Sequence, residues 1–278
     1  MPQMHLCSVR ALVPLGEGEK RGFFSLLLEG CGLPDWTPGQ FVMLRPESWS
    51  RELPWARPFS IGRWDGNGLE IFFQVVGRGT SLLAGLRPGE SVRIFGPLGQ
   101  GFAREENKPV LLLAGGMGIA PFAGYIPRRA GAPNLRLCFG HRAPLACYPY
   151  AALAGNCLSE HFPDERPGDL PSFLRRMEEL LAGNAREEGL VLACGPVPFL
   201  RAVRDLSLKH GARTQISLEN RMACGLGVCL GCVVKPLMDD KGRNRSRQPV
   251  PPALEQGLPV PVCSCGPVFW ADAVELDA

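Results

Sequence analysis

The chain has 278 residues, of which 45% are hydrophobic, so it is longer than one typical domain and can bury more than one core. Its 30 basic and 27 acidic side chains nearly balance, leaving a formal net charge of +3, so charge gives no reason to expect a nucleic-acid partner. We therefore expect two or three domains and a small molecule or a protein as partner.

The N-terminal residues lack the pattern of a secretory signal, because no basic region is followed by a long apolar run and a cleavage site. The uncharged stretch 109–127 is nearly long enough to span a bilayer, but Pro121 and its clustered glycines favour a strand, a turn and a helix start. The sequence therefore predicts a cytoplasmic protein without a membrane segment. In that compartment the eleven cysteines should stay reduced.

Residues 1–103 contain short apolar runs separated by Gly and Pro, a pattern that predicts a small antiparallel β-barrel or sandwich. One short helix signal, with Thr80 as its N-cap, interrupts these runs. The expected strands lie within residues 40–46, 57–64, 68–77 and 91–99.

Between residues 104 and 216 apolar strands alternate with helical patterns, which predicts a Rossmann-like, mostly parallel α/β sheet. Ligands of such sheets bind at the carboxyl ends of the strands, where the loops 114–118 and 193–196 are expected. The expected strands are 110–116, 135–142 and 189–196, and the expected helices follow Gly118 and cover 172–184 and 198–212.

Residues 217–278 are rich in Cys and Gly, and a segment of this size needs a metal centre to hold it together. Cys224, Cys229 and Cys232 have the C-x4-C-x2-C spacing with which plant-type ferredoxins wrap one loop around a two-iron cluster. The glycines between them let the backbone approach inorganic sulfur. The sequence thus predicts a [2Fe-2S] cluster and an electron-transfer protein.

The plant-type pattern needs a distant fourth thiolate, and its spacing does not distinguish Cys263 from Cys265. A zinc ion held by four thiolates is the alternative, although zinc usually draws its ligands from two close CxxC-like pairs. The remaining cysteines outside the nucleotide motifs are expected to be small buried hydrophobic residues: Cys7, Cys31, Cys138, Cys147 and Cys157.

Two motifs in the first region are candidate phosphate-binding segments. Residues 57–60 (RPFS) close one strand, and residues 77–80 (GRGT) end the next strand and open a helix, whose free N–H groups attract anions. Arg57 can add a charge-assisted hydrogen bond to the same phosphates. Each motif taken alone is common in ordinary strands and turns.

A glycine-rich strand end in the second region resembles a nucleotide-binding turn. Gly115, Gly116 and Gly118 would let the phosphates of a dinucleotide approach a helix N-terminus, although the full GxGxxG pattern is absent. A tight structural turn in an α/β domain is the alternative reading of the same residues.

A second turn, Cys194-Gly195-Pro196, is expected at the same edge of the sheet. Cys194 can border a nicotinamide or be a buried structural thiol, and the sequence does not decide between the two. His141 also ends a strand, but no partner for it is visible, so we assign it no catalytic role.

Seven motifs span nearly the whole chain in this order: RPFSI, GRGT, GPLGQGF, LLLAGGMGIAP, ACGP, SLENRMACGLGVCLGCVV and VCSCGPVF. Together they resemble the electron-transfer subunits of type B dihydroorotate dehydrogenase, a branch of the ferredoxin reductase superfamily. The resemblance implies an FAD-binding β-barrel at residues 1–103, an NAD-binding α/β domain at 104–216 and a [2Fe-2S] domain at 217–278.

The resemblance also implies cofactor-binding residues. It favours Cys263 as the fourth cluster ligand, because the family motif places its Cys three residues before GPVF. Gln74 departs from the family, which often has a basic residue there, and the segment between Cys232 and Cys263 is longer than usual. FAD is expected to be held by Arg57, Pro58, Phe59, Ser60, Phe72, Phe73, Gln74, Gly79 and Thr80.

The activity implied by the resemblance involves a partner. A catalytic subunit containing FMN would oxidise dihydroorotate in pyrimidine biosynthesis, and its electrons would pass through the cluster and FAD to NAD+, within a heterotetramer of two copies of each subunit. A flavin is needed because a cluster moves single electrons whereas nicotinamide accepts a hydride. Ser60 is expected to hydrogen-bond the flavin near its reactive nitrogen, and no residue is firmly assigned as catalytic.

Other functions remain open at this point. A reductase subunit of a cytoplasmic hydrogenase, a sulfhydrogenase or a ferredoxin:NADP oxidoreductase would share the flavin and nucleotide domains, although the last tends to replace the first cluster Cys by Asp. A self-contained oxidoreductase would need a substrate domain that this chain does not leave room for. A zinc-binding interaction module without enzymatic activity would be colourless.

Overall fold

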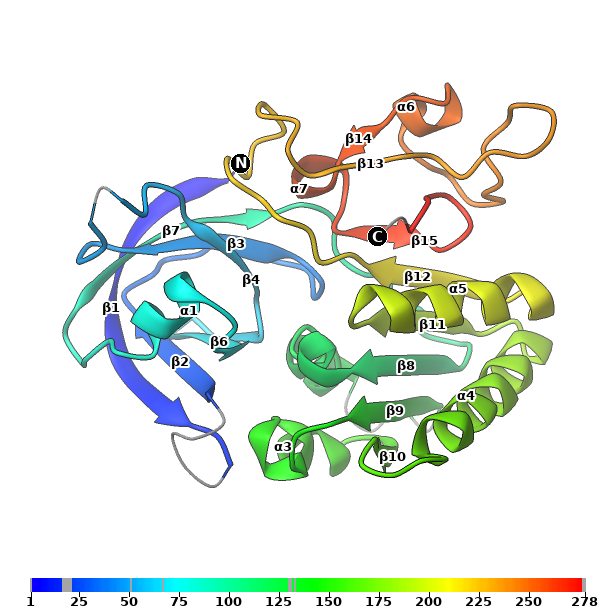
Figure 1. Cartoon of the computed structure of the whole chain (residues 1–278), viewed down its shortest axis with the longest axis horizontal. Helices are drawn as coiled ribbons and strands as arrows, with labels where there is room; N and C mark the ends of the chain where they lie inside the picture. The colour runs from blue at the N-terminus through cyan, green and yellow to red at the C-terminus, as the bar shows by residue number, and fades with distance from the viewer. Residues whose placement is uncertain are drawn as a thin grey trace.

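The computed structural model describes residues 2–16, 22–50, 52–66, 68–129, 132 and 134–276. Figure 1 shows two β-sheets side by side, with the C-terminal segment above them in this view. Among the described residues, no helix combines the length and the apolar character needed to cross a membrane.

The first sheet is formed by seven antiparallel strands. They are β1 (Gln3–Pro14), β2 (Phe23–Glu29), β3 (Phe41–Pro46), β4 (Arg57–Ser60), β5 (Arg63–Trp64), β6 (Gly68–Gln74) and β7 (Ser91–Leu98), with helix α1 (Arg78–Leu83) between the last two. Their order in the sheet is β4-β3-β7-β1-β2-β6-β5, and the sheet curves around its own core (Figure 1). Along β7 the buried Val92 and Ile94 alternate with exposed residues, as expected for a sheet with one face on the core. The expected antiparallel barrel architecture is confirmed.

Helix α1 begins after Gly77, and the prediction that Thr80 is its N-cap is wrong. Thr80 instead lies inside the first turn, where its Oγ1 accepts hydrogen bonds from the N–H groups of Val76 at 2.9 Å and Gly77 at 3.1 Å. The hydroxyl therefore reaches back to donors that precede the helix, which is why the helix begins three residues earlier than expected.

The second sheet has six strands in the order β10-β9-β8-β11-β12-β15, and all neighbours are parallel except β15. Its strands are β8 (Val110–Gly115), β9 (Leu135–His141), β10 (Leu158–Pro163), β11 (Leu190–Cys194), β12 (Arg213–Ser217) and β15 (Val268–Trp270). Its helices are α2 (Phe122–Tyr125), α3 (Tyr150–Ala154), α4 (Asp169–Arg186) and α5 (Val197–His210), with 3-10 turns at Gly116–Ile119, Pro127–Arg129 and Leu145–Cys147.

Strand β8 is buried on both faces because helices cover the sheet on both sides. Leu111 and Leu113 pack in the same core as α4 and α5, whereas Val110 and Leu112 pack with α2 and α3. This is the layered α/β architecture that the alternation of strands and helices predicts. In Figure 1 the carboxyl ends of β8 and β9 point toward the first sheet, so the loops that follow them face it.

The C-terminal segment returns to the second sheet. Its elements are β13 (Val233–Val234), α6 (Pro252–Glu255), β14 (Val260–Pro261), α7 (Val262–Cys265) and the strand β15 already described. Strands β13 and β14 pair with each other, and β15 pairs antiparallel with β12. The boundary that we place near residue 217 stays a prediction, since β15 belongs to the same sheet as β12.

Cys7 and Cys31 form a disulfide with their Cα atoms 4.8 Å apart, so the prediction of reduced thiols is wrong for this pair. The two residues come together because Cys7 lies on β1 and Cys31 follows β2, the strand that pairs with it. Both are buried in the core of the first sheet. Cys138 and Cys147 are buried thiols as expected, and Cys157 is partly exposed.

Gly118 provides a stability test, because a Cβ atom at this position would collide with the carbonyl of Cys194 at the end of β11. We expect Gly118→Ala to lower the free energy of unfolding by about 2 kcal/mol, the usual cost of overpacking a rigid site. Gly155→Ala is the matched control, since Gly155 has φ −71° and no heavy atom within 4 Å of an added Cβ. Chemical denaturation measures both variants, and equal midpoints would contradict the assigned contact.

Candidate functional site

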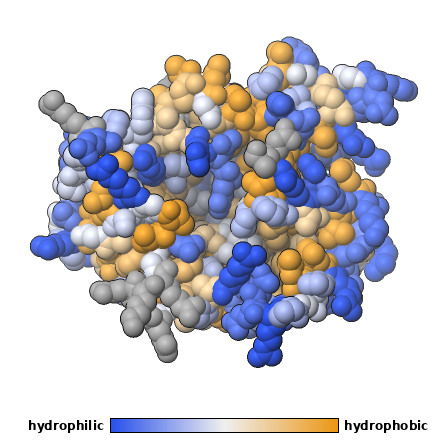
Figure 2. All heavy atoms as spheres, in the orientation of Figure 1, coloured by the Kyte–Doolittle hydropathy of each residue, from blue (hydrophilic) through white to orange (hydrophobic). Residues whose placement is uncertain are grey.

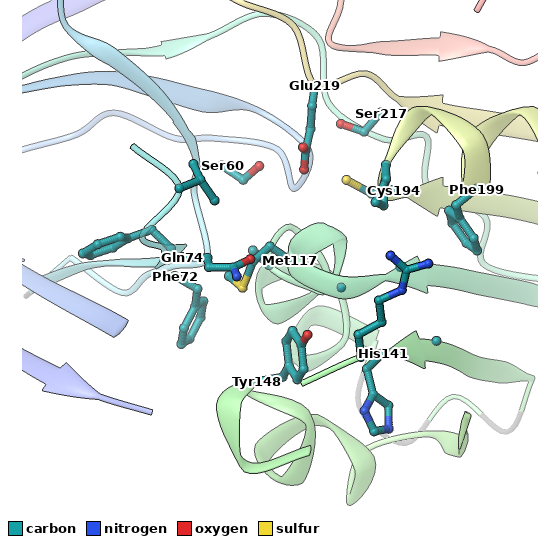
Figure 3. Close-up of a pocket in the computed structure, with 18 of the residues that line it drawn as sticks. Ser60, Phe72, Gln74, Met117, His141, Tyr148, Cys194, Phe199, Ser217 and Glu219 are labelled. Atoms are coloured by element: carbon teal, nitrogen blue, oxygen red, sulfur yellow. The ribbon is translucent and has the colours of Figure 1, made fainter. Parts of the chain in front are cut away.

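A cavity of about 1200 Å³ lies between the first sheet and the carboxyl ends of the second sheet. One wall comes from β4, β6 and the start of α1, and the other from the residues that follow β8, β9 and β11. Figure 3 shows Ser60, Gln74, Cys194 and Glu219 arranged around this space. The cavity therefore joins the two regions in which the sequence predicts flavin and nucleotide binding.

The predicted flavin-binding residues all line the first wall. Arg57 lies with its guanidinium carbon 5.7 Å from the centre of the Trp49 ring, and its Nη1 donates to the Trp55 carbonyl at 2.9 Å. An added Cβ at Gly79 would lie 3.2 Å from Arg57 Nε, so the end of β4 and the start of α1 adjoin. The complete predicted set on this wall is Arg57, Pro58, Phe59, Ser60, Phe72, Phe73, Gln74, Gly79 and Thr80.

The opposite wall contains part of the predicted nucleotide-binding set, namely Gly115, Gly116, Cys194 and Pro196. The residues that line the cavity do not include Gly118 or Gly195. Those two glycines lie where neighbouring segments pack closely. An added Cβ at Gly118 would collide with the Cys194 carbonyl, and one at Gly195 would collide with the Phe199 side chain. Their small size therefore brings the two strand-end loops together.

The segment 224–232, here called the cysteine loop, has an unusual backbone. Gly225 and Gly227 have φ values of +69° and +78°, and Leu230, which carries a side chain, has φ +53°. The N–H of Leu226 donates to Cys224 Sγ at 3.3 Å, and the N–H of Gly227 donates to Cys263 Sγ at 3.1 Å. The loop thus directs backbone amides at sulfur atoms.

Thiols of the cysteine loop pair with each other and with Cys263 of α7. Amide donors, first that of Cys229 and then that of Leu226, lower the pKa of Cys224 to about 6. Burial raises the pKa of Cys263 to about 12, with a further contribution from its hydrogen bond with Cys232. Cys265 lies instead beside Ser264, with their Sγ and Oγ atoms 3.9 Å apart. Within the described ranges, no three Cys, His, Asp or Glu side chains converge as a group that could hold a single metal ion.

Comparison with known proteins identifies the chain's relatives. A family model described as the iron-sulfur cluster binding domain of dihydroorotate dehydrogenase B matches residues 219–247. The dihydroorotate dehydrogenase B (NAD(+)) electron transfer subunit of Caldanaerobacter subterraneus subsp. tengcongensis is 34% identical over 239 residues, which cover 85% of this chain and 86% of the relative. The corresponding subunit of Listeria monocytogenes is 29% identical over 258 residues, covering 91% and 93%. This chain belongs to the family of these electron-transfer subunits.

Solved structures agree with the fold of this family. The structure of an NADH-dependent reduced ferredoxin-NADP oxidoreductase aligns with a TM-score of 0.77 and 20% identity, covering 98% of this chain and 90% of the other. The ferredoxin reductase of carbazole 1,9a-dioxygenase aligns with a TM-score of 0.63 and 20% identity, covering 76% and 67%. The chain therefore has a ferredoxin-reductase-like fold.

Cys194 is a buried neutral thiol in this family member. Its pKa is strongly raised, first by burial and then by the neighbouring carboxyl of Glu219. At neutral pH the sulfur is therefore protonated and is not a thiolate nucleophile. From the sequence, Cys194 has two alternative roles, a structural thiol or a neighbour of nicotinamide. Its position on the cavity wall agrees with both.

Glu219 is a cavity residue to which the sequence analysis gave no role, although it lies in the SLENRMACG motif. Its side chain extends into the cavity near Ser217 and Cys194 (Figure 3), where its surface stays open to the cavity while desolvation by the surrounding walls raises its pKa. Among the described residues, no charged or hydrogen-bonding neighbour contributes to this shift. The sequence signal for a role of Glu219 was a single acidic residue that follows a strand and begins a Cys-rich motif.

His141 has a partner that the sequence analysis did not find. Its Nδ1 donates to the Ala143 carbonyl at 2.8 Å, and its Nε2 is 3.1 Å from Nδ1 of His161. Burial, and then the proximity of His141, lower the pKa of His161. The partner was missed because it lies on β10, an edge strand absent from the predicted elements.

The raised pKa of Glu219 predicts a pH-dependent effect of Glu219→Gln on stability. In the unfolded chain the carboxyl ionises near its ordinary pKa of 4.5, whereas in the folded chain its pKa is higher. The wild-type free energy of unfolding therefore falls as pH rises from about 4.5 through the raised pKa of the folded state. The melting temperature of Glu219→Gln should therefore exceed that of wild type by a margin that grows across this pH window. Thermal unfolding between pH 4 and pH 8 measures the margin.

Glu165→Gln is the control for this titration, because Glu165 does not line the cavity whereas Glu219 does. Its melting curve should follow that of wild type at every pH. Parallel pH profiles for Glu219→Gln and wild type would contradict the assigned environment of Glu219.

Proposed function

We propose that this chain binds FAD in the cavity and a [2Fe-2S] cluster at the cysteine loop, and carries electrons from a partner subunit to NAD+. The observation that supports it most is continuity of packing between the two sites. An added Cβ at Gly225 would lie 2.7 Å from Met43 on β3, so the cysteine loop rests on the first sheet. Phe41, two residues earlier on β3, lines the cavity and shares a core with Cys232 and Cys263.

The cavity residues suit a flavin dinucleotide. Arg57 and the N-terminal residues of α1 offer a cation and small side chains for its phosphates, while Phe72 and Phe59 offer apolar surface for the ring. Ser60, at the end of β4, offers a hydroxyl toward the reactive edge of the ring. Gln74 carries no charge, so the cations on this wall are Arg57 and Arg78.

The cysteine loop suits a two-iron cluster. A [2Fe-2S] cluster of the plant type would be held by four thiolates. Cys224 contacts Cys229 and Cys232 contacts Cys263, so two pairs of thiols are available to hold it. The amides of Leu226 and Gly227, which donate to sulfur, would stabilise the negative charge of a bound cluster.

The chain's own residues then have distinct tasks. The flavin would supply the conversion between single electrons and a hydride, which neither a cluster nor nicotinamide performs alone. The first wall holds and orients the flavin, and the loops after β8 and β11 bind the dinucleotide so that its nicotinamide can reach the same space. The thiol of Cys194 and the carboxyl of Glu219 border that space, and the thiol is uncharged because its pKa is raised.

The electron donor in this proposal is a catalytic subunit that contains FMN and oxidises dihydroorotate to orotate in pyrimidine synthesis, in a complex with two copies of each subunit. The family relationship supports this partner, because the relatives are named as subunits of dihydroorotate dehydrogenase B. Leu226, Val228 and Leu230 are exposed within the cysteine loop, as is Cys229, so the loop is accessible to a donor. Figure 2 shows hydrophobic surface gathered at the top of this face of the molecule.

Affinity purification of the tagged chain from its own host tests the proposal. The complex should contain an FMN-binding dihydroorotate dehydrogenase subunit, and anaerobic dihydroorotate should reduce NAD+ in its presence. The partner subunit alone, assayed with an artificial acceptor, is the control for dihydroorotate oxidation. A complex with intact FAD and cluster that reduces NAD+ from another donor, but not from dihydroorotate, would contradict the proposed pathway.

The two candidate cysteines give a sharper test of the cluster. Cys263→Ser should abolish or strongly reduce iron and acid-labile sulfide in the purified chain, because it removes one member of a thiol pair. Cys265→Ser, two residues away in the same short helix α7, is the matched control and should retain both. Iron and sulfide analysis with visible spectroscopy gives the readout, and the opposite pattern would move the fourth ligand to Cys265.

A further inference from the structure

We propose that Asp164 makes the nucleotide site select the unphosphorylated ribose of NAD(H) over the 2′-phosphorylated ribose of NADP(H), by neutralising Arg142 and presenting its carboxylate to ribose hydroxyls. This inference rests on the proposed use of the cavity for a nicotinamide dinucleotide. It assigns the selecting residue, which neither the motifs of the chain nor its family membership identifies.

Arg142 and Asp164 occupy equivalent positions on neighbouring strands. His141 ends β9 and is paired in parallel register with Pro163, which ends β10, so the next residue on each strand is Arg142 or Asp164. The backbone N–H of Asp164 donates to the carbonyl of His141 at 2.8 Å, which fixes the loop. Both side chains consequently lie at the carboxyl edge of the sheet, and both line the cavity.

The side chains of these two residues form an ion pair at the rim of the cavity. Arg142 Nε donates to Asp164 Oδ2 at 2.8 Å, while the Arg142 side chain remains 83% exposed and that of Asp164 is 30% exposed. In dinucleotide-binding sheets an acidic group in this region hydrogen-bonds the ribose hydroxyls, whereas an arginine accommodates a 2′-phosphate. This chain has both groups, so the balance between them decides which ribose is accepted.

A second carboxylate shifts the balance toward the unphosphorylated ribose. Asp169 begins α4 and lines the same rim, and its Oδ2 accepts hydrogen bonds from the N–H groups of Glu165 at 3.0 Å and Arg166 at 2.8 Å. These amides lower the pKa of Asp169, so it is ionised at neutral pH. Its negative charge lies at the helix N-terminus, where a phosphate would otherwise be attracted.

The charges of the rim therefore disfavour a 2′-phosphate. Among the described residues that line this part of the cavity are one guanidinium, that of Arg142, and two carboxylates, those of Asp164 and Asp169; Arg166 interacts with Asp169 but is not part of the lining. A phosphate would have to displace Asp164 from Arg142 and remain close to Asp169. Ribose hydroxyls can donate to Asp164 while its ion pair with Arg142 stays in place.

Binding of two small probes to the full-length chain tests the assignment without relying on turnover. Adenosine 5′-monophosphate and adenosine 2′,5′-bisphosphate differ only in the 2′-phosphate, and calorimetry gives both affinities. Wild type should prefer the monophosphate. Asp164→Asn should shift the affinity ratio toward the bisphosphate by about tenfold or more, because Arg142 is released and one negative charge is removed.

Two further variants make the result specific. Asp164→Asn combined with Arg142→Ala should lose the gain in bisphosphate affinity, since the guanidinium that contacts the phosphate is gone. Asp205→Asn breaks another exposed Arg–Asp contact, on α5 and outside the cavity lining, and should leave the ratio unchanged. Exposed ion pairs contribute little stability, so all variants should fold, and thermal unfolding checks this.

The outcomes separate this inference from the proposed function. An unchanged ratio in Asp164→Asn, or a wild-type preference for the bisphosphate, would overturn the role of Asp164 while leaving dinucleotide binding intact. Binding of neither probe, nor of NADH, to wild type would overturn the proposed dinucleotide site and this inference together.

Discussion

Close packing of the cysteine loop on the first sheet is the constraint that relates the two candidate cofactor sites. Gly225 fits against Met43 and Leu98 only because it has no side chain and adopts a positive φ. The same sheet forms one wall of the cavity through β4 and β6. Phe41 lines the cavity and shares a core with Cys232 and Cys263, so buried side chains connect the two sites.

The second sheet is coupled to this arrangement at two places. Strand β15, which follows Cys263 and Cys265, pairs with β12, and β12 leads directly into Glu219 and the cysteine loop. The loops after β8 and β11 approach each other because Gly118 leaves space for the Cys194 carbonyl. The cavity is therefore bounded by elements whose relative positions are set by backbone contacts, which suits a site where electron and hydride donors must be held at fixed separations.

The sequence predicted those features that depend on local pattern or on spacing. Apolar alternation was enough to find β7, strand and helix alternation predicted the parallel sheet, and the motifs at Arg57 and Gly79 predicted residues that meet on one wall. Features created by pairing between distant segments were missed. His161 lies on the edge strand β10, whose residues show little apolar character, and Asp164 directly follows that strand. The disulfide of Cys7 with Cys31 depends on the register of β1 and β2.

The most direct test of the account is anaerobic addition of NADH to the purified chain alone, followed by visible and electron paramagnetic resonance spectroscopy. Electron transfer within one chain predicts that the flavin absorbance bleaches and that the signal of a reduced [2Fe-2S] cluster appears in the same sample. Bleaching of the flavin with a cluster that stays oxidised, although dithionite reduces it, would contradict the proposed connection between the two sites.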